Sequence, residues 1–297
     1  MPEGDTIHRA AATLRPVLEG RELVRVAADP RVVPPMPAGT RVEVVEARGK
    51  HLLMRFSTGA WLHTHMQMTG SWHVYPAGAR WRDRADGAVV VLGVAGAEAV
   101  CFRAPVVEVV ADPARHPVLA ALGPDLCVPP VDLDVVLRRL SHLARPDAEV
   151  GTVLLDQRPA CGIGNVYKSE VAFIERVDPF AASADVDPAT WRALYDRAHR
   201  LLVANLTSPL RTTAPGPPGS AWVYDRAGRP CRVCETPIRV DRQGDDARVT
   251  YWCPRCQGPG PRRPGRRAAG RAAAPGATRH TAADSPATGR PRRGDPR

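Results

Sequence analysis

The first residues of the chain place a small secondary amine beside a carboxylate. The sequence begins Met1-Pro2-Glu3-Gly4, and the small side chain at position 2 permits removal of the initiator methionine. Removal would leave Pro2 with a free α-amino nitrogen, a group that titrates at about 7.7–8.0 and is therefore partly neutral and nucleophilic. Its attack on an aldehyde-like carbon would give an iminium ion, and Glu3 could move protons beside it. The alternative is a disordered N-terminus with no catalytic role.

Two cysteine pairs near the C-terminal end have the spacing of a structural zinc site. Two CxxC pairs stand 18 residues apart, so each offers two thiolates from one turn and together they complete a tetrahedron. Between them, Thr236–Trp252 alternates like a β-hairpin with a turn near Gly244 and Arg248 just past it. Such a hairpin could enter a nucleic-acid groove, although zinc ribbons also bind proteins and the cysteines could instead form disulfide or redox pairs. The expected ligands of one zinc ion are Cys231, Cys234, Cys253 and Cys256.

Lysine is almost excluded from this chain. Lysine and arginine together number 41, but only Lys50 and Lys168 are lysines. Arginine keeps its proton at ordinary pH, whereas lysine can release its proton when its pKa is lowered. A lysine in a chain that otherwise uses arginine therefore suggests a chemical role for its amine. Gly49 predicts a turn that aims Lys50 inward, ahead of a strand over His51–Phe56. For Lys168, chance survival at the surface is an equal alternative.

The next predicted strand, Trp61–Met66, carries two histidines and runs into a turn. His63 and His65 would share one face of this strand, but no carboxylate or cysteine lies beside them in the sequence, which argues against a metal site. The turn Gln67-Met68-Thr69-Gly70 could present an apolar wedge to a gap between bases. A buried methionine is the simpler interpretation.

Composition excludes several classes of protein. The 297 residues are 44% apolar, as in globular proteins, and contain no run of 18 apolar residues or secretory signal. Seven cysteines, three of them scattered, favour a reducing cytoplasm over a disulfide framework. The net charge is +10, but residues 258–297 hold ten arginines and two aspartates, which leaves +2 for the rest. A nucleic-acid surface on the folded part must therefore be a local patch.

Hydrophobic periodicity divides the chain into a strand-rich half and a helical half. A helix over Ile7–Leu18, capped by Asp5 or Thr6, precedes Val-rich strands typical of a sandwich or barrel. After a turn-rich segment at 122–130, apolar residues recur at helical spacing. The expected strands are Val42–Val45, His51–Phe56, Trp61–Met66, Ala88–Val94 and Val106–Val110. The expected helices are Leu133–Leu143, Val150–Gln157, Asn165–Ile174 and Thr190–Leu206.

Glycine and proline mark two further segments. Gly162 and Gly164 would expose backbone amides at the N-terminus of Asn165–Ile174, where a phosphate could bind, although ordinary helix entries also use glycine. Residues 208–220 are rich in Pro and Gly and predict a mobile loop. The composition of residues 258–297 predicts a disordered basic tail, which could add affinity for DNA or be only a solvated appendage.

Together these motifs resemble one family, the formamidopyrimidine-DNA glycosylases and endonucleases VIII of bacterial base-excision repair. The resemblance spans roughly residues 2–257 and favours the endonuclease VIII branch. It rests on separated motifs in a fixed order: Pro-Glu-Gly at 2–4, Arg-Gly-Lys at 48–50, His-x-Gln-Met-x-Gly at 65–70, Leu-Gly-Pro-Asp at 122–125, Leu-Asp-Gln…Gly-Ile-Gly-Asn-Val-Tyr-Lys-Ser-Glu at 155–170 and Thr-Tyr-Trp-Cys-Pro at 250–254.

The resemblance implies an α+β multidomain fold. Its parts would be an N-terminal β-sandwich with a leading helix (1–123), a linker (124–131), a helix-two-turn-helix domain (132–220), a zinc β-hairpin (221–257) and the disordered Arg-rich tail (258–297). The implied partner is double-stranded DNA with a damaged base or abasic site, bound by a monomer with the damaged nucleotide flipped out. The implied location is the bacterial cytoplasm, at the nucleoid.

The resemblance also implies roles for individual residues. Pro2 would attack the sugar C1′ carbon, Glu3 would move protons, and Lys50 would contact phosphate and assist protonation. Asn165 and Arg248 would clamp the phosphates that flank the flipped nucleotide. The implied function is a bifunctional DNA glycosylase and abasic-site lyase, which forms a Schiff base and breaks the strand by elimination. The residues that would fill the gap in the duplex are Gln67, Met68 and Thr69.

Three departures from the family pattern bear on specificity. Asp5-Thr6 stands where the family commonly has Pro-Glu, which leaves the role of these positions open. Residues 208–220 are short where purine-specific members carry a lesion-covering loop, which favours oxidised pyrimidines over 8-oxoguanine. The turn at Met68 lacks an aromatic residue, so strand discrimination would be poor. The alternatives are an 8-oxoguanine- and formamidopyrimidine-specific glycosylase, and a non-catalytic nucleic-acid-binding zinc protein on the same scaffold.

Overall fold

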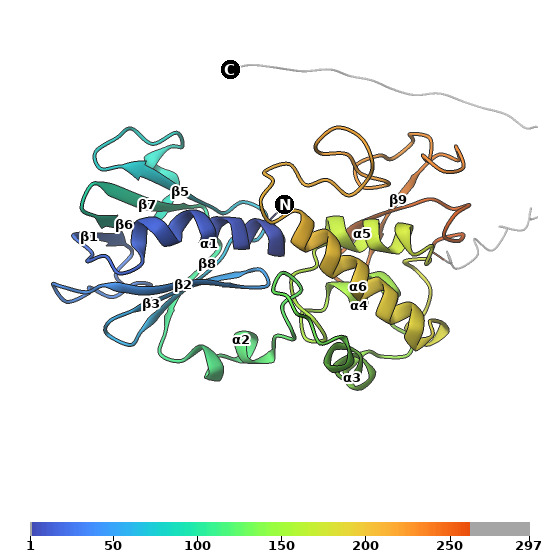
Figure 1. Ribbon diagram of the computed structural model, residues 1–297, viewed down its shortest axis with the longest axis horizontal. Helices are drawn as coiled ribbons and strands as arrows, with labels where there is room; N and C mark the ends of the chain where they lie inside the picture. The colour runs from blue at the N-terminus through green and yellow to red at the C-terminus, as the bar shows by residue number, and fades with distance from the viewer. Residues whose placement is uncertain (1, 262–297) are drawn as a thin grey trace, which may run out of the picture. The chain divides into compact units, whose positions relative to one another are not determined.

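The computed structural model describes residues 2–261, which form a strand-rich lobe followed by a helical lobe (Figure 1). The multidomain α+β fold expected from the sequence is confirmed for this part of the chain. The predicted basic tail lies outside the described residues from position 262 onward.

Two four-stranded antiparallel sheets make up the strand-rich lobe. One has the order β2 (Val42–Arg48), β3 (His51–Phe56), β4 (Trp61–His65) and β8 (Val106–Val110). The other has the order β1 (Arg25–Ala28), β6 (Ala88–Val94), β7 (Ala97–Phe102) and β5 (Ser71–Pro76). The bounds predicted for β3, β6 and β8 are confirmed, whereas β1, β5 and β7 were not predicted. β1 has only four residues, and β7 is buried on both faces, so neither shows a two-residue alternation.

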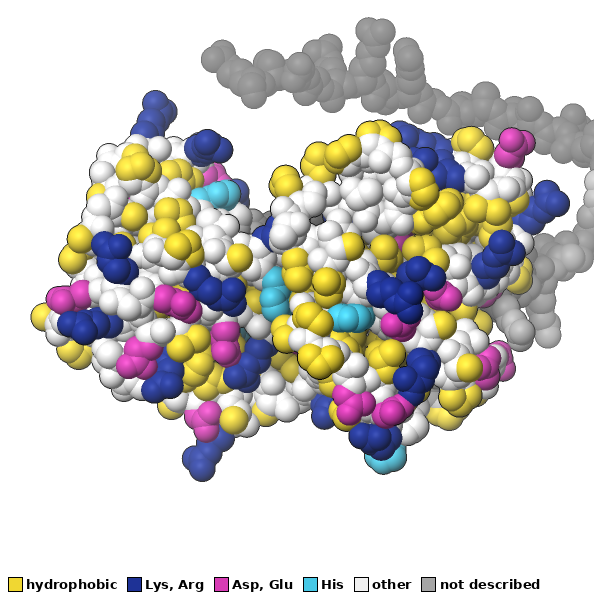
Figure 2. All heavy atoms as spheres, viewed as in Figure 1, with side chains coloured by type: hydrophobic (Ala, Val, Ile, Leu, Met, Phe, Trp, Pro, Cys, Tyr) yellow, Lys and Arg dark blue, Asp and Glu magenta, His cyan; other side chains and the backbone are white. Residues whose placement is uncertain are grey.

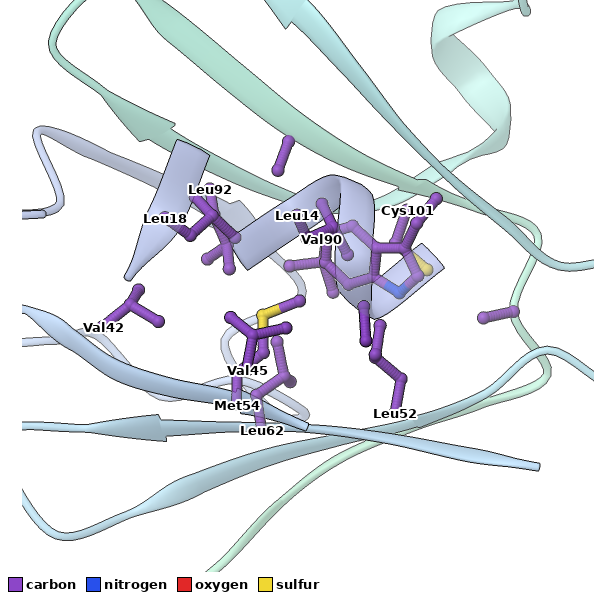
Figure 3. Close-up of a cluster of buried hydrophobic side chains, with 14 of the residues drawn as sticks. Leu14, Leu18, Val42, Val45, Leu52, Met54, Leu62, Val90, Leu92 and Cys101 are labelled. Atoms are coloured by element: carbon purple, nitrogen blue, oxygen red, sulfur yellow. The ribbon is translucent and has the colours of Figure 1, made fainter. Parts of the chain in front are cut away.

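Helix α1 (Gly4–Leu18) fills the space between the two sheets. Figure 3 shows Leu14 and Leu18 among side chains from both sheets, and Ile7 is equally buried. Burying each such side chain stabilises the fold by about 1.5–3 kcal/mol. The helix starts before the predicted position, so Asp5 and Thr6 lie in its first turn and are not its caps. This packing fixes the first residues of the chain against the lobe.

Four helices form the second lobe: α3 (Leu133–Leu143), α4 (Val150–Leu155), α5 (Asn165–Ile174) and α6 (Pro188–Ala204). A short helix, α2 (Pro117–Ala121), precedes them. The bounds of α3 and α5 are those predicted, and Asp132 caps α3 by accepting from the N–H groups of Asp134 and Val135. Among residues 2–261, every helix is too short or too polar to span a bilayer.

A two-stranded hairpin, β9 (Arg239–Gln243) and β10 (Arg248–Trp252), follows the helices. Its turn contains Gly244 at a φ of 68°, as the sequence predicts. One buried carboxylate fastens this module to α5, because Glu170 accepts hydrogen bonds from the N–H groups of residues 222, 223 and 224 and from the Thr213 hydroxyl. Thr213 N–H also donates to the carbonyl of Ser220 at 2.9 Å. The loop predicted to be mobile, 208–220, is therefore anchored at its middle and at its C-terminal end.

Candidate active site

A cavity of about 280 Å³ gathers segments that are far apart in the sequence. The residues that line this cavity include His65, Leu155 and Asp246, which the sequence did not single out as lining a DNA site. On the face shown in Figure 2, basic and acidic side chains are interspersed over both lobes. Six residues predicted from the sequence line the cavity: Pro2, Lys50, Gln67, Met68, Asn165 and Arg248.

Glu3 joins the start of the chain to the N-terminus of α5. Its side chain is fully buried and accepts hydrogen bonds from the N–H groups of Gly164 (2.9 Å), Val166 (2.7 Å) and Tyr167 (3.3 Å). These amides carry the positive end of the helix dipole, so a carboxylate is stabilised there. The expectation that a phosphate binds these amides is therefore wrong, because the protein's own carboxylate occupies them.

Two glycines make this approach possible. A Cβ at Gly164 would lie 2.4 Å from Cδ of Glu3, and a Cβ at Gly4 would lie 2.8 Å from Sγ of Cys127. Gly4 N–H also donates to the carbonyl of Gly162 at 2.9 Å. The Pro-Glu-Gly and Gly-x-Gly-Asn motifs are thus two halves of one contact, and Pro2 is held at the edge of the cavity.

Lys50 lies in the two-residue turn between β2 and β3. Gly49 adopts a φ of 54°, and a Cβ there would lie 2.8 Å from Cys161, which explains the glycine. The Lys50 ammonium donates to the carbonyl of Ile163 at 2.9 Å, so the inward aim predicted from the sequence is confirmed. Burial lowers the pKa of Lys50; the negative charge of Glu3 opposes this shift and Arg248 adds to it.

The turn after β4 presents an apolar side chain to solvent. Met68 is 59% exposed, so the interpretation as a buried methionine is wrong for this residue, whereas Met66 is buried. Gln67 adopts a φ of 44°, and the Thr69 hydroxyl donates to the carbonyl of Arg103 at 3.0 Å. Thr69 thus ties the turn to the sheet, while Gln67 and Met68 face the cavity.

The hairpin brings Arg248 to the opposite wall. The side-chain amide of Asn165 donates to the carbonyl of Val249 at 2.6 Å, and the Lys168 ammonium donates to the same oxygen at 3.1 Å. Lys168 is fully buried, so the possibility of a chance surface lysine is excluded. Arg248 is exposed and forms an ion pair with Asp246 at 3.3 Å. Asn165 and Arg248, the two residues expected to bind phosphate, therefore both line the cavity.

Asp5, where the family commonly has proline, is buried in an ionic cluster. Its carboxylate accepts from Nε and Nη2 of Arg211 at 3.0 and 2.5 Å and from Arg9 at 3.1 Å. Burial by itself raises the pKa of Asp5, but the hydrogen bonds and charges of Arg211 and Arg9 outweigh it and the net pKa is lowered. Asp5 thus ties α1 to the segment after α6.

Three histidines of one sheet, His51, His63 and His65, lie together with His116, which follows β8. Nδ1 of His51 and Nε2 of His63 are 2.8 Å apart, and Glu108 lies 2.8 Å from His63 and 3.2 Å from His116. Nδ1 of His116 accepts the Leu119 N–H, so the proton of a neutral ring is on Nε2, the atom that faces Glu108. The carboxylate that the sequence did not show is present, but the ring nitrogens of His63 and His116 already have hydrogen-bond partners, which favours a hydrogen-bonded network over a metal site.

The four cysteines predicted as metal ligands form one cluster. Their sulfurs are separated by 3.4 Å (Cys234 to Cys253 and Cys234 to Cys256) and 3.9 Å (Cys231 to Cys256). A disulfide needs about 2.05 Å, so the alternative of two disulfides does not fit. The cluster could hold a metal ion with tetrahedral coordination.

Comparison with known proteins matches both lobes to one family. The formamidopyrimidine-DNA glycosylase N-terminal domain matches residues 1–105, and the formamidopyrimidine-DNA glycosylase H2TH domain matches residues 122–213. The chain belongs to the formamidopyrimidine-DNA glycosylase and endonuclease VIII family. A probable endonuclease 8 from Streptomyces coelicolor is 41% identical over 88% of this chain and 96% of its own length. A DNA-(apurinic or apyrimidinic site) lyase, Nei2, from Mycolicibacterium smegmatis is 38% identical over 86% and 99%.

Solved structures of the family have the same fold. The MutM (Fpg) protein from Thermus thermophilus is 28% identical, with a TM-score of 0.69 over 88% of this chain and 100% of its own. Lactococcus lactis formamidopyrimidine-DNA glycosylase bound to DNA with an abasic site has a TM-score of 0.72 over 86% and 99%. At 18% identity, the second likeness supports the fold alone.

Several residues of this family site were not assigned from the sequence. His65 was considered only as a metal ligand, yet it lines the cavity beside Lys50. Asp125, in the segment predicted to be a linker, accepts from Gly49 N–H at 2.7 Å and lies 2.8 Å from His8. The rarity of lysine in this chain was the signal that could have identified Lys168 as a residue of the site. The motif Leu-Gly-Pro-Asp includes Asp125, but its role could not be assigned from the sequence because both of its partners, Gly49 and His8, are remote in sequence.

Acid should destabilise the fold through His51. Burial lowers the pKa of His51 to about 2, whereas its pKa in an unfolded chain is about 6.5, so between these values the unfolded state binds more protons. Stability is therefore lost as pH falls below 6.5, by about 2 kcal/mol at pH 5 for one such group. We expect the Tm of the wild type to fall by on the order of 5 °C more than that of His51→Gln between pH 7 and pH 5. Thermal unfolding at a series of pH values tests this, and parallel curves for the two proteins would contradict it.

Proposed function

We propose that this protein is a bifunctional DNA glycosylase and abasic-site lyase of base-excision repair. The observation that carries the proposal is the convergence of Pro2, Lys50, Asn165 and Arg248 on one cavity, with Glu3 buried behind it. The more similar relatives, named endonuclease 8 and abasic-site lyase, support the same activity. The partner is double-stranded DNA with a damaged base or abasic site, and the reaction takes place in the bacterial cytoplasm, at the nucleoid.

The reaction begins with the nitrogen of Pro2, freed by removal of Met1. Its lone pair attacks C1′ of the flipped nucleotide, the bond from C1′ to the base breaks, and the sugar ring opens to a protein-bound iminium ion. The iminium ion acidifies the C2′ proton, and loss of that proton expels the 3′ phosphate. Glu3, next in sequence, moves protons during ring opening and elimination. Lys50 contacts phosphate and assists protonation, helped by its lowered pKa.

The remaining cavity residues hold the distorted duplex. Asn165 and Arg248 clamp the phosphates on either side of the flipped nucleotide. Met68, exposed on its turn, enters the gap left in the base stack, with Gln67 and Thr69 beside it. The strand-rich part (1–123) thus carries the chemistry, and the helical part (132–220) with the hairpin module (221–257) carries the clamp.

Oxidised pyrimidines are the proposed substrates. The segment 208–220 is short and anchored, which leaves little chain to cover a bulky purine lesion. Relatives named endonuclease 8 are 40–41% identical to this chain, whereas those named formamidopyrimidine-DNA glycosylase are 32–33% identical. A panel of duplexes, each with one defined lesion, separates this substrate class from 8-oxoguanine.

Borohydride reduction tests the chemistry. The wild type should form a stable covalent adduct with damaged duplex, because reduction converts the iminium ion to an amine. Pro2→Gly and Glu3→Gln should each reduce strand cleavage by at least about a hundredfold, since general acid–base catalysis alone contributes about 10²–10⁴-fold. The readouts are denaturing gels for cleavage and for adduct.

The two variants differ in their expected stability, which provides a control. Pro2→Gly should leave the Tm unchanged, because Pro2 makes no buried polar contact in the described structure. Glu3→Gln places an amide N–H2 against N–H donors at the start of α5, at a cost of about 1–3 kcal/mol, so its Tm should fall. An unreduced rate of cleavage by Pro2→Gly would contradict the proposal.

We also propose that the four cysteines hold one structural zinc ion. Four thiolates at about 2.3 Å from zinc lie about 3.8 Å apart, close to the separations of 3.4–3.9 Å in the cluster. Four protein ligands leave no open position, so the ion shapes the hairpin and takes no part in the chemistry. Metal analysis should give one zinc per chain.

Removal of zinc should weaken DNA binding. Cys234→Ser should lose the ion and loosen the hairpin that carries Arg248, so affinity for an abasic duplex should fall about tenfold or more. A DNA titration of the variant and of chelator-treated wild type measures this. Full affinity in zinc-free protein would contradict the structural role.

A further inference from the structure

Lys168, which the proposed chemistry does not use, is a buried cation bound only to neutral groups. It lies on α5 with 0% exposure, and its ammonium donates to the carbonyl of Val249 at 3.1 Å and to the hydroxyl of Thr250 at 2.7 Å. The Thr250 hydroxyl gives its own proton to Oε1 of Gln243 at 2.9 Å, so it accepts from Lys168. In the part of the chain that the structure describes, no carboxylate forms an ion pair with this ammonium.

A buried charge without an opposite charge in contact is unusual. Buried ammonium groups lose their hydration and are normally compensated by a paired anion. Burial lowers the pKa of Lys168 to about 7; Glu3 and Glu149 oppose this shift from beyond ion-pair distance, and Arg248 adds to it. Lys168 therefore lies in a place where an additional negative charge would stabilise its charged form.

The cavity offers a place for that negative charge. The carbonyl of Val249 also accepts the side-chain amide of Asn165 at 2.6 Å, so the Lys168 ammonium and this amide lie next to each other on one oxygen. Asn165 lines the cavity, and so does Arg248, which precedes Val249 in the chain. An amide nitrogen carries two N–H groups, so Asn165 can keep the carbonyl and donate its second N–H to a phosphate. A phosphate bound there would bring a negative charge close to the buried ammonium.

We propose that the DNA phosphate bound by Asn165 is the counter-ion of Lys168, so that the protein binds DNA with Lys168 in its charged form. The two charges attract each other through the protein interior, where water and salt screen them weakly. The inference rests on the proposed function, because it takes the ligand of Asn165 to be a DNA phosphate. It extends the phosphate site to a residue that does not touch DNA.

The counter-ion makes DNA affinity depend on pH in a defined direction. The pKa of Lys168 is about 7 in the free protein, and a nearby negative charge raises the pKa of a lysine by about one unit or more. Binding is therefore accompanied by proton uptake between about pH 7 and pH 8. The contribution of Lys168 to affinity is complete at pH 6 and is lost as pH rises to 9. A shift of one unit corresponds to about tenfold in affinity.

DNA titrations at pH 6 and pH 9 test the charge of Lys168. The proteins are wild type, Lys168→Met and Lys168→Gln, which is uncharged but retains a donor for the Val249 carbonyl, and the ligand is a duplex with an abasic-site analogue. The affinity lost by each variant should be about tenfold greater at pH 6 than at pH 9, because the wild-type lysine is neutral at pH 9. Pro2 and Lys50 titrate in all three proteins, so their effects cancel in the comparison.

An equal loss of affinity at both pH values would overturn the inference, because lost packing or a lost hydrogen bond does not depend on pH. A measurement on the wild type avoids any effect of the variants on folding. The chain has only two lysines, so protein labelled with carbon-13 lysine gives two Cε signals, and Lys50→Arg assigns one of them by its absence. Addition of the duplex should raise the titration midpoint of the Lys168 signal by about one pH unit. An unchanged or lowered midpoint would contradict the proposal.

The same signal shows whether one phosphate is the counter-ion. In duplexes that carry a neutral methylphosphonate at one position at a time, the rise in midpoint should be lost for a single phosphate beside the abasic-site analogue. An equal small loss at every position would mean that the field of the whole DNA acts on Lys168, and would overturn the inference. These readouts need no iminium ion, so the predicted midpoint shift without a borohydride adduct would reject the proposed lyase reaction and leave the counter-ion in place.

Discussion

The carboxylate of Glu3 at the N-terminus of α5 is the contact on which the site depends. It joins Glu3 to backbone amides that lie 161–164 positions further along the sequence. It also places Pro2, the preceding residue, at the cavity wall. Three backbone N–H groups and a helix dipole stabilise the charge, so a buried carboxylate is tolerated. The same contact explains why glycine is required at Gly164, and the close approach of Gly162 and Cys127 requires glycine at Gly4.

Charged side chains hold the rest of the junction. Arg211 binds Asp5 from the segment after α6, its guanidinium lies 5.0 Å from the centre of the Tyr167 ring, and Glu170 holds the hairpin module to α5. These groups are buried and paired, so the loss of one partner would leave an uncompensated charge. Helix α5 thus contacts the N-terminal residues of the chain at its own N-terminus and the hairpin module along its length.

Local patterns predicted what depends on neighbours in sequence, and the remainder required the fold. The helical period predicted the bounds of α3 and α5, a capping aspartate also marked the start of α3, and the CxxC spacing predicted the cysteine cluster. The glycines before Asn165 suggested an anion site, but the anion is Glu3, which no local pattern could reveal. The role of Asp5 was equally hidden, because Arg211 lies 206 residues away. The catalytic assignments came from the family resemblance, and the cavity supports them by bringing those residues together.

The central claim is that the nitrogen of Pro2 forms the bond to deoxyribose. Peptide mapping of the borohydride-reduced adduct by mass spectrometry tests it most directly, since this chain has only two competing side-chain amines, Lys50 and Lys168. The account predicts that the sugar remnant is found on the peptide that begins at Pro2. A remnant on the peptide of either lysine, or a mature chain that retains Met1, would contradict it.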